Sequence, residues 1–280
     1  MTDNISISTP IIRKVLNRKS SQLGALDFIF KELATRVISR LDYIKLTPKR
    51  ILDCGSGLGF DRELLAQKYP ESLLIELDCA IEVLRPQLPP KSKWSLWRKL
   101  SSRQFVCGDA YHLPLATASI DFFYSNLLLP YISDIPAFIR EMRRMLALGG
   151  AFCFAGLGVD SLKELRAFGL SSYRFPDMHD IGDMLIDAGF SNPVVDTEYI
   201  TLDYDDLQTL LQDIRLVACG AANDASLRRK ISKGQFTELT NQLKNKSKLT
   251  LEVFVAHGWK DRNKIELPAG QSIINFQSHK

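Results

Sequence analysis

Apolar and polar residues alternate in blocks along the first 155 positions of the chain. Short apolar runs predict strands at 50–54, 73–78, 104–107, 119–125 and 151–155. Between these runs apolar residues recur every three or four positions, which predicts helices at 61–69, 80–86 and 135–147. A chain in which strands alternate with helices forms a mostly parallel sheet with helices on both faces. We therefore expect an α/β fold for this part of the chain.

The segments on either side of this block complete the predicted organisation. Apolar residues at helical spacing predict an amphipathic helix over 26–44, before the first strand. Later patterns predict a short helix around 162–168, a helix at 177–189, a strand at 193–204, helices near 204–218 and 234–245, and a last strand at 249–257. Two antiparallel neighbours need only a hairpin between them, so we expect the helices at 204–245 to form a cap inserted before the last strand. The predicted organisation is a helical segment (1–45), a central domain (46–260) and a C-terminal tail (261–280).

The first predicted strand ends in a glycine-rich turn, Asp53-Cys54-Gly55-Ser56-Gly57-Leu58-Gly59. Glycines allow a tight turn whose backbone N–H groups approach a ligand that side chains would keep away. The spacing differs from the G-x-G-x-x-G of dinucleotide binders, and no Gly-Lys-Ser/Thr follows to hold a triphosphate. We interpret the turn as one wall of a different kind of nucleotide site.

Polar residues also end the next three predicted strands. Asp78 ends the second strand, and a carboxylate there accepts both hydroxyl groups of a ribose. Asp109 and Ala110 follow the third strand, where an acid bonds the exocyclic amine of an adenine, and Asn126 ends the fourth. Because parallel strands end at one edge of a sheet, these residues are expected to line one ligand crevice.

Together these motifs resemble those of the class I S-adenosylmethionine-dependent methyltransferases, over roughly residues 25–155. The resemblance implies a Rossmann-like fold and S-adenosylmethionine as the cofactor. In that family the glycine turn packs against the methionine moiety, the acid ending strand two holds the ribose, and the next acid faces the adenine. By resemblance the cofactor-binding residues are Asp53, Gly55, Ser56, Gly57, Gly59, Asp78, Asp109, Ala110 and Asn126.

Further segments are similar to the BioC-type group, the malonyl-[acyl-carrier protein] O-methyltransferases of biotin synthesis. These segments are residues 125–127, 141–150, 160–166, 175–183 and 249–260. The resemblance implies a carboxyl O-methyltransferase whose partner is an acyl carrier protein bearing a malonyl thioester. Pro130-Tyr131 stands where that group often has His-Trp. The same segments also resemble a sister group, the methyltransferase-fold complex I assembly factors, described as hydroxylating an arginine, so that this alternative stays open.

A methyl ester forms from a carboxylate that is already ionised at pH 7, so such an enzyme needs no general base. It needs a group that positions the anion, and one guanidinium can hold one carboxylate oxygen while the other faces the methyl group. Arg166 is the first candidate for this role and Arg174 the second, the alternative for both being a surface ion pair. Tyr131 is expected to wall the acceptor pocket, the alternative being core packing.

Composition narrows the classes of partner. No apolar stretch approaches the ~20 residues that span a bilayer, so we expect no membrane segment. A net charge of +4 is too small to indicate nucleic-acid binding, and Ser125-Asn126-Leu127-Leu128 lacks the Asn/Asp-Pro-Pro-Tyr usual in base-amine methyltransferases. Basic clusters at 91–103 and 228–233 are either solvated faces or surfaces that bind an acidic protein partner, such as the carrier protein, or nucleic acid.

Cysteine and histidine usage sets the remaining expectations. The 5 cysteines show no C-x-x-C pairing, which is typical of small buried residues in a reducing compartment, so we expect a cytoplasmic protein. We also expect a monomer. The 4 histidines are too scattered to predict a metal site. Residues 1–25 carry several basic residues among serines and predict a frayed basic terminus rather than an organelle-targeting segment.

Overall fold

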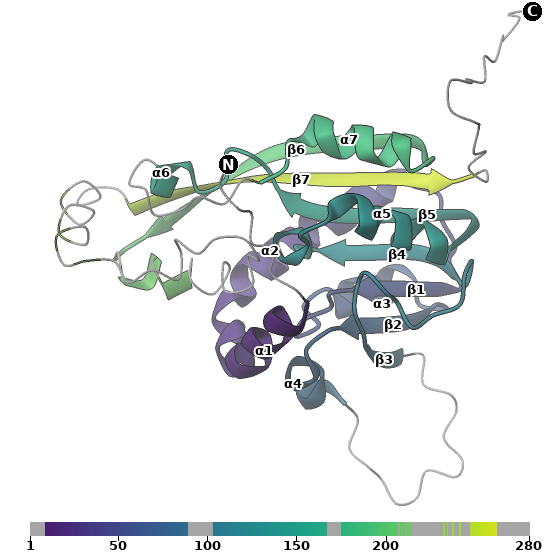
Figure 1. Cartoon of the computed structure of the whole chain (residues 1–280), viewed down its shortest axis with the longest axis horizontal. Helices are drawn as coiled ribbons and strands as arrows, with labels where there is room; N and C mark the ends of the chain where they lie inside the picture. The colour runs from purple at the N-terminus through teal and green to yellow at the C-terminus, as the bar shows by residue number, and fades with distance from the viewer. Residues whose placement is uncertain are drawn as a thin grey trace, which may run out of the picture.

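The computed structural model describes residues 9–88, 103–166, 175–206 and 247–261, and singly or in pairs and threes residues 208–210, 212, 213, 232, 234, 237 and 241. Its centre is a 7-stranded sheet in the order β3-β2-β1-β4-β5-β7-β6 (Figure 1). The strands are β1 (Arg50–Cys54), β2 (Leu73–Asp78), β3 (Arg103–Cys107), β4 (Ile120–Asn126), β5 (Leu146–Leu157), β6 (Ser191–Tyr204) and β7 (Ser247–Lys260). Strands β1 to β5 pair in parallel, and β7 runs antiparallel to both β5 and β6. The expected mostly parallel α/β sheet is confirmed.

Helices cover both faces of this sheet. The α-helices are α1 (Thr9–Lys19), α2 (Asp27–Arg40), α3 (Arg62–Lys68), α4 (Ile81–Leu84), α5 (Ile135–Met145), α6 (Lys163–Arg166) and α7 (Met178–Asp187). The 3₁₀ helices are η1 (Ser20–Leu26), η2 (Leu41–Tyr43), η3 (Arg85–Gln87) and η5 (Leu129–Tyr131). Among the helices of the described ranges, none is long and apolar enough to cross a membrane.

Alternation along β4 divides the core into two layers. Phe123 packs with α5 and α7 on one face, whereas Phe122 and Tyr124 pack with α2 and α3 on the other. Successive side chains of a strand point to opposite faces, and both faces are covered here, so the strand is buried almost throughout. This double burial explains why the sequence shows a nearly continuous apolar run rather than alternation.

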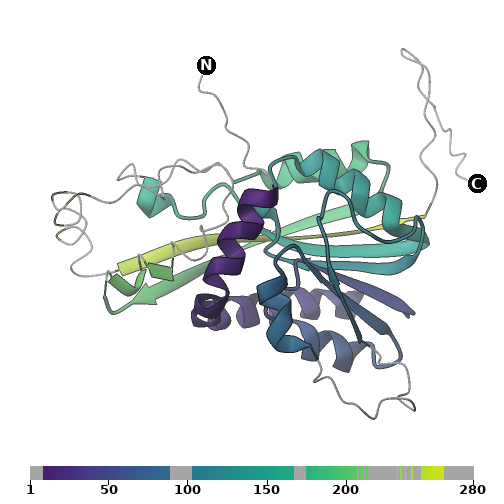
Figure 2. The ribbon, with the colours of Figure 1, turned by 60° about the horizontal axis from the view of Figure 1, so that its bottom comes forward.

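The register of the parallel strands brings the polar strand ends together. Cys54 lies beside Leu77, and Asp78 lies beside Cys107. The glycine turn after β1 therefore lies next to the acid that ends β2 and the Gly108-Asp109 pair that follows β3. Figures 1 and 2 show α1 and α4 beside this edge of the sheet.

The junction of α5 and β5 differs from the prediction. The helix ends at Met145 instead of 147, and β5 begins at Leu146 instead of 151. The Lys260 side chain from β7 donates to the carbonyl oxygens of Arg143 at 3.0 Å and of Leu146 at 2.7 Å. A buried lysine therefore satisfies carbonyls at the helix end, a contact between distant segments that local sequence does not encode.

The N-terminal segment also differs from the prediction. Thr9–Lys19 forms a helix instead of a frayed terminus, because Ile12 and Leu16 bury one helical face. The predicted strands 193–204 and 249–257 exist and are longer than expected, at 14 residues each. The predicted cap is described only in a few residues beyond Tyr204, and the tail only at Asp261.

Candidate functional site

A cavity of about 920 Å³, counting the space at its open mouth, lies at the carboxyl edge of the parallel strands. Its lining is mostly apolar with a few polar groups, which is typical of a small-molecule site. The glycine turn and the ends of β2, β3 and β4 form its base. Residues of the N-terminal helices α1 and η1 also line it. The lining residues are Thr9, Ile12, Leu16, Leu23, Phe30, Gly55, Ser56, Gly57, Leu58, Phe60, Asp61, Leu77, Asp78, Cys79, Val83, Gly108, Asp109, Ala110, Tyr111, Asn126, Leu127, Leu128, Tyr131 and Ile132.

The glycine turn adopts a backbone that only glycine enters readily. Gly55, Gly57 and Gly59 have φ values of 79°, 54° and 76°. The N–H groups of Gly55 and Ser56 both donate to the Leu77 carbonyl, at 2.8 and 2.9 Å. A ligand can therefore approach the backbone of the turn closely. The N–H groups of Gly55 and Ser56, however, which were expected to face the ligand, already donate to the protein itself.

Asp78 holds this turn as well as lining the cavity. Its Oδ2 accepts from the N–H of Gly57 at 3.1 Å, and its Oδ1 accepts from the N–H of Ala80 at 2.8 Å. Burial raises the pKa of Asp78, and these backbone hydrogen bonds oppose the rise. Each oxygen keeps a lone pair for a further donor, so the carboxylate can accept both hydroxyls of a ribose.

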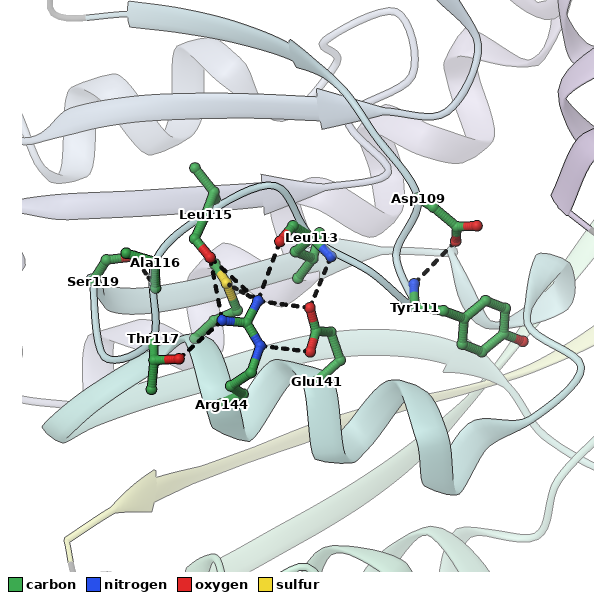
Figure 3. Close-up of polar contacts among 10 residues, drawn as sticks. Asp109, Tyr111, Leu113, Leu115, Ala116, Thr117, Ser119, Glu141 and Arg144 are labelled. Carbon is green, nitrogen blue, oxygen red and sulfur yellow. Dashed lines mark hydrogen bonds and ion pairs between the residues drawn. The ribbon is translucent and has the colours of Figure 1, made fainter.

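Asp109 and Ala110 lie where the third strand leads into a long loop. Asp109 Oδ1 accepts from the N–H of Tyr111 at 3.0 Å, which leaves Oδ2 for another donor (Figure 3). Ala110 belongs to the same buried apolar cluster as Leu77 and Ile132, and all three line the cavity. A polar edge next to an apolar slot suits an adenine ring.

Arg144 on α5 anchors the loop that follows this adenine slot (Figure 3). Its guanidinium donates to the carbonyl oxygens of Leu113 at 3.1 Å and Leu115 at 3.2 Å. It also pairs with Glu141 at 2.7 Å, whose Oε1 accepts from the N–H of Leu113 at the same distance. The hydrogen bond from Arg144 lowers the pKa of Glu141. Arg144 and Glu141 therefore hold the loop together.

Replacing this arginine should loosen the adenine slot. We expect Arg144→Met to lower the free energy of unfolding by about 1–3 kcal/mol, because charged hydrogen bonds to two carbonyls are lost. Affinity for 5′-methylthioadenosine, which contains the adenosyl group alone, should fall severalfold by calorimetry. The matched control is Arg140→Met, on the same helix but exposed. Equal behaviour of the two variants would contradict the anchoring role.

Asp61 is a cavity residue that the sequence did not single out. It precedes α3, but its side chain makes no cap hydrogen bond. Its Oδ1 instead accepts from the Tyr124 hydroxyl at 2.6 Å and from Asn126 Nδ2 at 2.9 Å. Burial raises its pKa to about 6, against the effect of these two donors. The only signal in the sequence was an acid directly after the turn, where an N-cap is the ordinary reading.

Asp53 occupies a different place from the one its motif implied. It is buried beneath the turn and does not belong to the cavity wall. Both its carboxyl oxygens are buried without a hydrogen-bond partner, and burial together with the neighbouring Asp61 raises its pKa well above the usual range. A direct contact with a ligand in the cavity is therefore not what this geometry offers.

An ionic network behind the turn fixes its outer side. Glu76 is fully buried on β2 and pairs with Arg62 at 2.5 Å and Arg103 at 3.0 Å. Arg62 also donates to Gln87, whose Nε2 donates to the Gly57 carbonyl at 2.7 Å. The network links α3, β2 and η3 to the turn, which pre-organises it.

The structure brings together most of the predicted site. Gly55, Ser56, Gly57, Asp78, Asp109, Ala110, Asn126 and Tyr131 all line the cavity. Gly59 lies at the back of the turn, against Arg62 and Gln87. Arg166 ends α6, but its side chain and all of Arg174 lie outside what the structure describes. Within the described residues, no group of three or more metal-ligating side chains was found.

The cysteines fit their expected role only in part. Cys54 and Cys153 are buried, as expected of small apolar residues, but Cys107 is exposed. Burial raises the pKa of Cys54 well above its usual value, so its thiol stays protonated next to the turn. Cys219 lies outside the described residues.

The residues of the cavity fit S-adenosylmethionine. Two acids stand at the ends of adjacent strands, and apolar residues lie beside the second. One unpaired acceptor, Asn126 Oδ1, is buried at the end of β4. A ligand with ribose hydroxyls, an adenine and a cationic chain supplies the donors that this set lacks.

Comparisons with known proteins agree with this fit. The sequence matches the family model described as a methyltransferase domain over residues 52–154. It is 42% identical over 270 residues to the malonyl-[acyl-carrier protein] O-methyltransferase of Gallionella capsiferriformans (strain ES-2), covering 91% of each chain. It is 35% identical over 279 residues to the protein of the same name from Methylovorus sp. (strain MP688), covering 95% of this chain and 94% of the relative.

Solved structures share the fold. Haemonchus contortus phosphoethanolamine N-methyltransferase 2, in complex with S-adenosyl-L-methionine, superposes with a TM-score of 0.56 at 16% identity, covering 90% of this chain and 60% of that one. The YcgJ protein of Bacillus subtilis superposes with a TM-score of 0.56 at 14% identity, covering 82% of this chain and all of the other. These likenesses show a common architecture of the central sheet and its helices.

Proposed function

Because the chain belongs to the malonyl-[acyl-carrier protein] O-methyltransferase family of class I methyltransferases, we propose that it methylates the free carboxylate of a malonyl group on acyl carrier protein. The reaction would serve biotin synthesis. The observation that carries the proposal is the 42% identity over 91% of both chains. A cavity whose acids and apolar slot fit the cofactor supports it.

The described residues perform the binding part of this chemistry. S-Adenosylmethionine supplies a methyl group activated by a positively charged sulfur. Asp78 holds the ribose, Asp109 and Ala110 bind the adenine, and Ile12 and Leu16 of α1 exclude water from the cavity. Exclusion of water removes the hydration shell that makes a carboxylate a weak nucleophile, and orientation lowers the remaining barrier.

The acceptor carboxylate needs a cation that the described cavity wall does not supply. Among the lining residues that the structure describes, none is a lysine or an arginine. We therefore retain Arg166 and Arg174 as the candidates that position this anion, and Tyr131, which lines the cavity, as a wall of the acceptor pocket. Their roles stay predictions.

Transfer of label from methyl-labelled S-adenosylmethionine to malonyl-carrier protein tests the proposed function. We expect a base-labile methyl ester on the malonyl group. Arg166→Leu should lower kcat/KM for this substrate by a factor of about 100, the value of a lost charged pair in a dry site, and leave cofactor affinity unchanged. Tight cofactor binding with no ester on the carrier would favour the assembly-factor alternative.

The carrier protein needs a docking surface at the cavity mouth, and we assign it to the exposed face of α1. Arg13, Lys14 and Arg18 are exposed on this helix, which carries no acidic residue, while Ile12 and Leu16 on its other face line the cavity. No ion pair within the described ranges involves these three cations. An acidic carrier docked there would lie next to the entrance.

The two basic clusters singled out in the sequence, 91–103 and 228–233, fall largely outside the described residues. Residues 91–102 and 228–231 lie outside the described residues, so their part in docking stays a prediction. Arg103 is described, and its guanidinium pairs with the buried Glu76 and stacks on Phe105. It therefore serves the network behind the glycine turn.

Reversing the charge of the α1 face should weaken binding of the carrier protein without affecting a small substrate that lacks the carrier. For the Arg13→Glu/Lys14→Glu variant we expect KM for malonyl-carrier protein to rise at least tenfold at low salt, and kcat to change less than twofold. A small malonyl thioester should keep its kinetic constants. The control is Lys45→Glu, an exposed lysine before β1, at the opposite edge of the sheet. An equal rise for both substrates would contradict docking on α1.

A further inference from the structure

A group of hydrogen-bond acceptors without donors gathers where β4 ends. The Tyr124 hydroxyl and Asn126 Nδ2 both donate to Oδ1 of Asp61, and no other side chain in the described part of the molecule donates to this carboxylate. Asn126 turns its amide nitrogen toward Asp61 and the Phe30 carbonyl, which leaves its Oδ1 buried without a partner. The Ser56 hydroxyl is buried and unpaired as well. Asp61, Asn126 and Ser56 all line the cavity.

Buried acceptors without donors are costly and are rare in folded proteins. A structural acid at the start of α3 would satisfy itself by capping the helix, yet Asp61 makes no such bond. Its side chain instead lies among two side chains of β4 that orient it. The arrangement suits a ligand that brings several N–H donors and a positive charge.

We propose that Asp61 receives the α-ammonium group of the methionyl part of S-adenosylmethionine, with Tyr124 and Asn126 as the residues that position it. The inference rests on the proposed use of that cofactor. An ammonium group carries three N–H donors and no acceptor, so it matches a set of acceptors that lacks donors. Asp61 Oδ2 accepts one N–H in a charge-assisted bond, and Asn126 Oδ1 is a second acceptor in the same wall.

A pair of ligands separates this contact from the rest of the site. S-Adenosylhomocysteine carries the ammonium group, whereas 5′-methylthioadenosine lacks the whole amino-acid part. We expect Asp61→Asn to weaken binding of S-adenosylhomocysteine about 30-fold by calorimetry and to change the affinity for 5′-methylthioadenosine less than twofold. Asp78→Asn is the matched control, because Asp78 faces the ribose and its loss should weaken both ligands.

A ligand change on the natural chain makes the test independent of how the variant folds. The deamino analogue of S-adenosylhomocysteine, in which hydrogen replaces the α-ammonium, should bind the unaltered protein about 30-fold more weakly. It should bind Asp61→Asn no more weakly than it binds the unaltered protein. Tyr124→Phe should weaken S-adenosylhomocysteine severalfold with the same selectivity, as expected of a positioning residue.

Two outcomes would overturn the assignment. One is an equal loss for both ligands in Asp61→Asn, and the other is independent, additive losses for the variant and the deamino analogue. Failure of S-adenosylhomocysteine to bind the unaltered protein is a different result, since it would remove the proposed function itself.

The pH dependence of binding adds a second readout. Asp61 must be ionised to pair with the ammonium, and burial raises its pKa to about 6, so affinity for S-adenosylhomocysteine should fall as pH drops from 7 to 5, by up to tenfold per unit below 6. The groups facing it are Tyr124 on β4 and Asp53 on β1, and burial raises the pKa of both, which favours their neutral forms. Asp78 has a raised pKa too, and 5′-methylthioadenosine, which depends on Asp78, controls for it. A profile shared by both ligands would exclude Asp61 as its source.

Discussion

Asp78→Ala is expected to lower the affinity for S-adenosylhomocysteine by about two to four orders of magnitude. The variant loses two charge-assisted hydrogen bonds to ribose hydroxyls, each worth about 1.5–3 kcal/mol. It also loses the acceptor that binds the N–H of Gly57 at 3.1 Å, so the glycine turn is freed on its cavity side. Isothermal titration calorimetry with S-adenosylhomocysteine measures the change directly.

A control variant separates loss of the ribose contact from general effects of removing an aspartate. Asp183→Ala removes an exposed aspartate of α7, a helix that contributes nothing to the cavity wall described above. It should bind S-adenosylhomocysteine as the natural chain does. An Asp78→Ala variant that stays folded and binds within threefold of the natural chain would show that the ribose lies elsewhere.

The sequence predicted the sheet well because its signals are local and repeated. β1 and β2 occupy the predicted residues 50–54 and 73–78. A strand of a parallel sheet is buried on both faces, so it appears in the sequence as a short, nearly continuous apolar run. The proximity of Asp78 and Asp109 was also predictable. Once the strands are parallel and adjacent, their carboxyl ends must lie at one edge, and the pairing of Asp78 with Cys107 places the two acids on neighbouring strands.

The hydrogen bonds of the site were not predictable, because several polar groups lie near each donor or acceptor and the sequence does not say which of them bonds it. Backbone N–H groups of the glycine turn were expected to face the ligand, but Gly55, Ser56 and Gly57 donate to Leu77 and Asp78. Asp61 was expected to open a helix, yet Tyr124 hydrogen-bonds it in the interior. These contacts join segments about 20 to 60 residues apart, and spacing along a chain does not report them.

Gly55→Val is expected to lower the affinity for S-adenosylhomocysteine more than 100-fold and the free energy of unfolding by about 2 kcal/mol. Gly55 has φ of 79°, a region that a β-branched residue enters only under strain. A Cβ at this position would lie 2.9 Å from Cδ1 of Leu128, and Leu128 itself lines the cavity. The new side chain must therefore displace Leu128 and change the shape of the cavity wall.

Gly149→Val provides the matched comparison that separates the contact with Leu128 from the backbone strain. Gly149 has φ of 81°, nearly the same backbone, but lies exposed in β5 with nothing within 4 Å of a Cβ placed there. Both variants should therefore show similar strain in chemical denaturation, while Gly149→Val keeps the affinity of the natural chain for S-adenosylhomocysteine. Because strain is common to the two and the contact with Leu128 is not, a difference in affinity reports the shape of the cavity at the glycine turn. Equal affinities in the two variants would mean that the turn does not approach the ligand, and the position assigned to the cofactor would then be wrong.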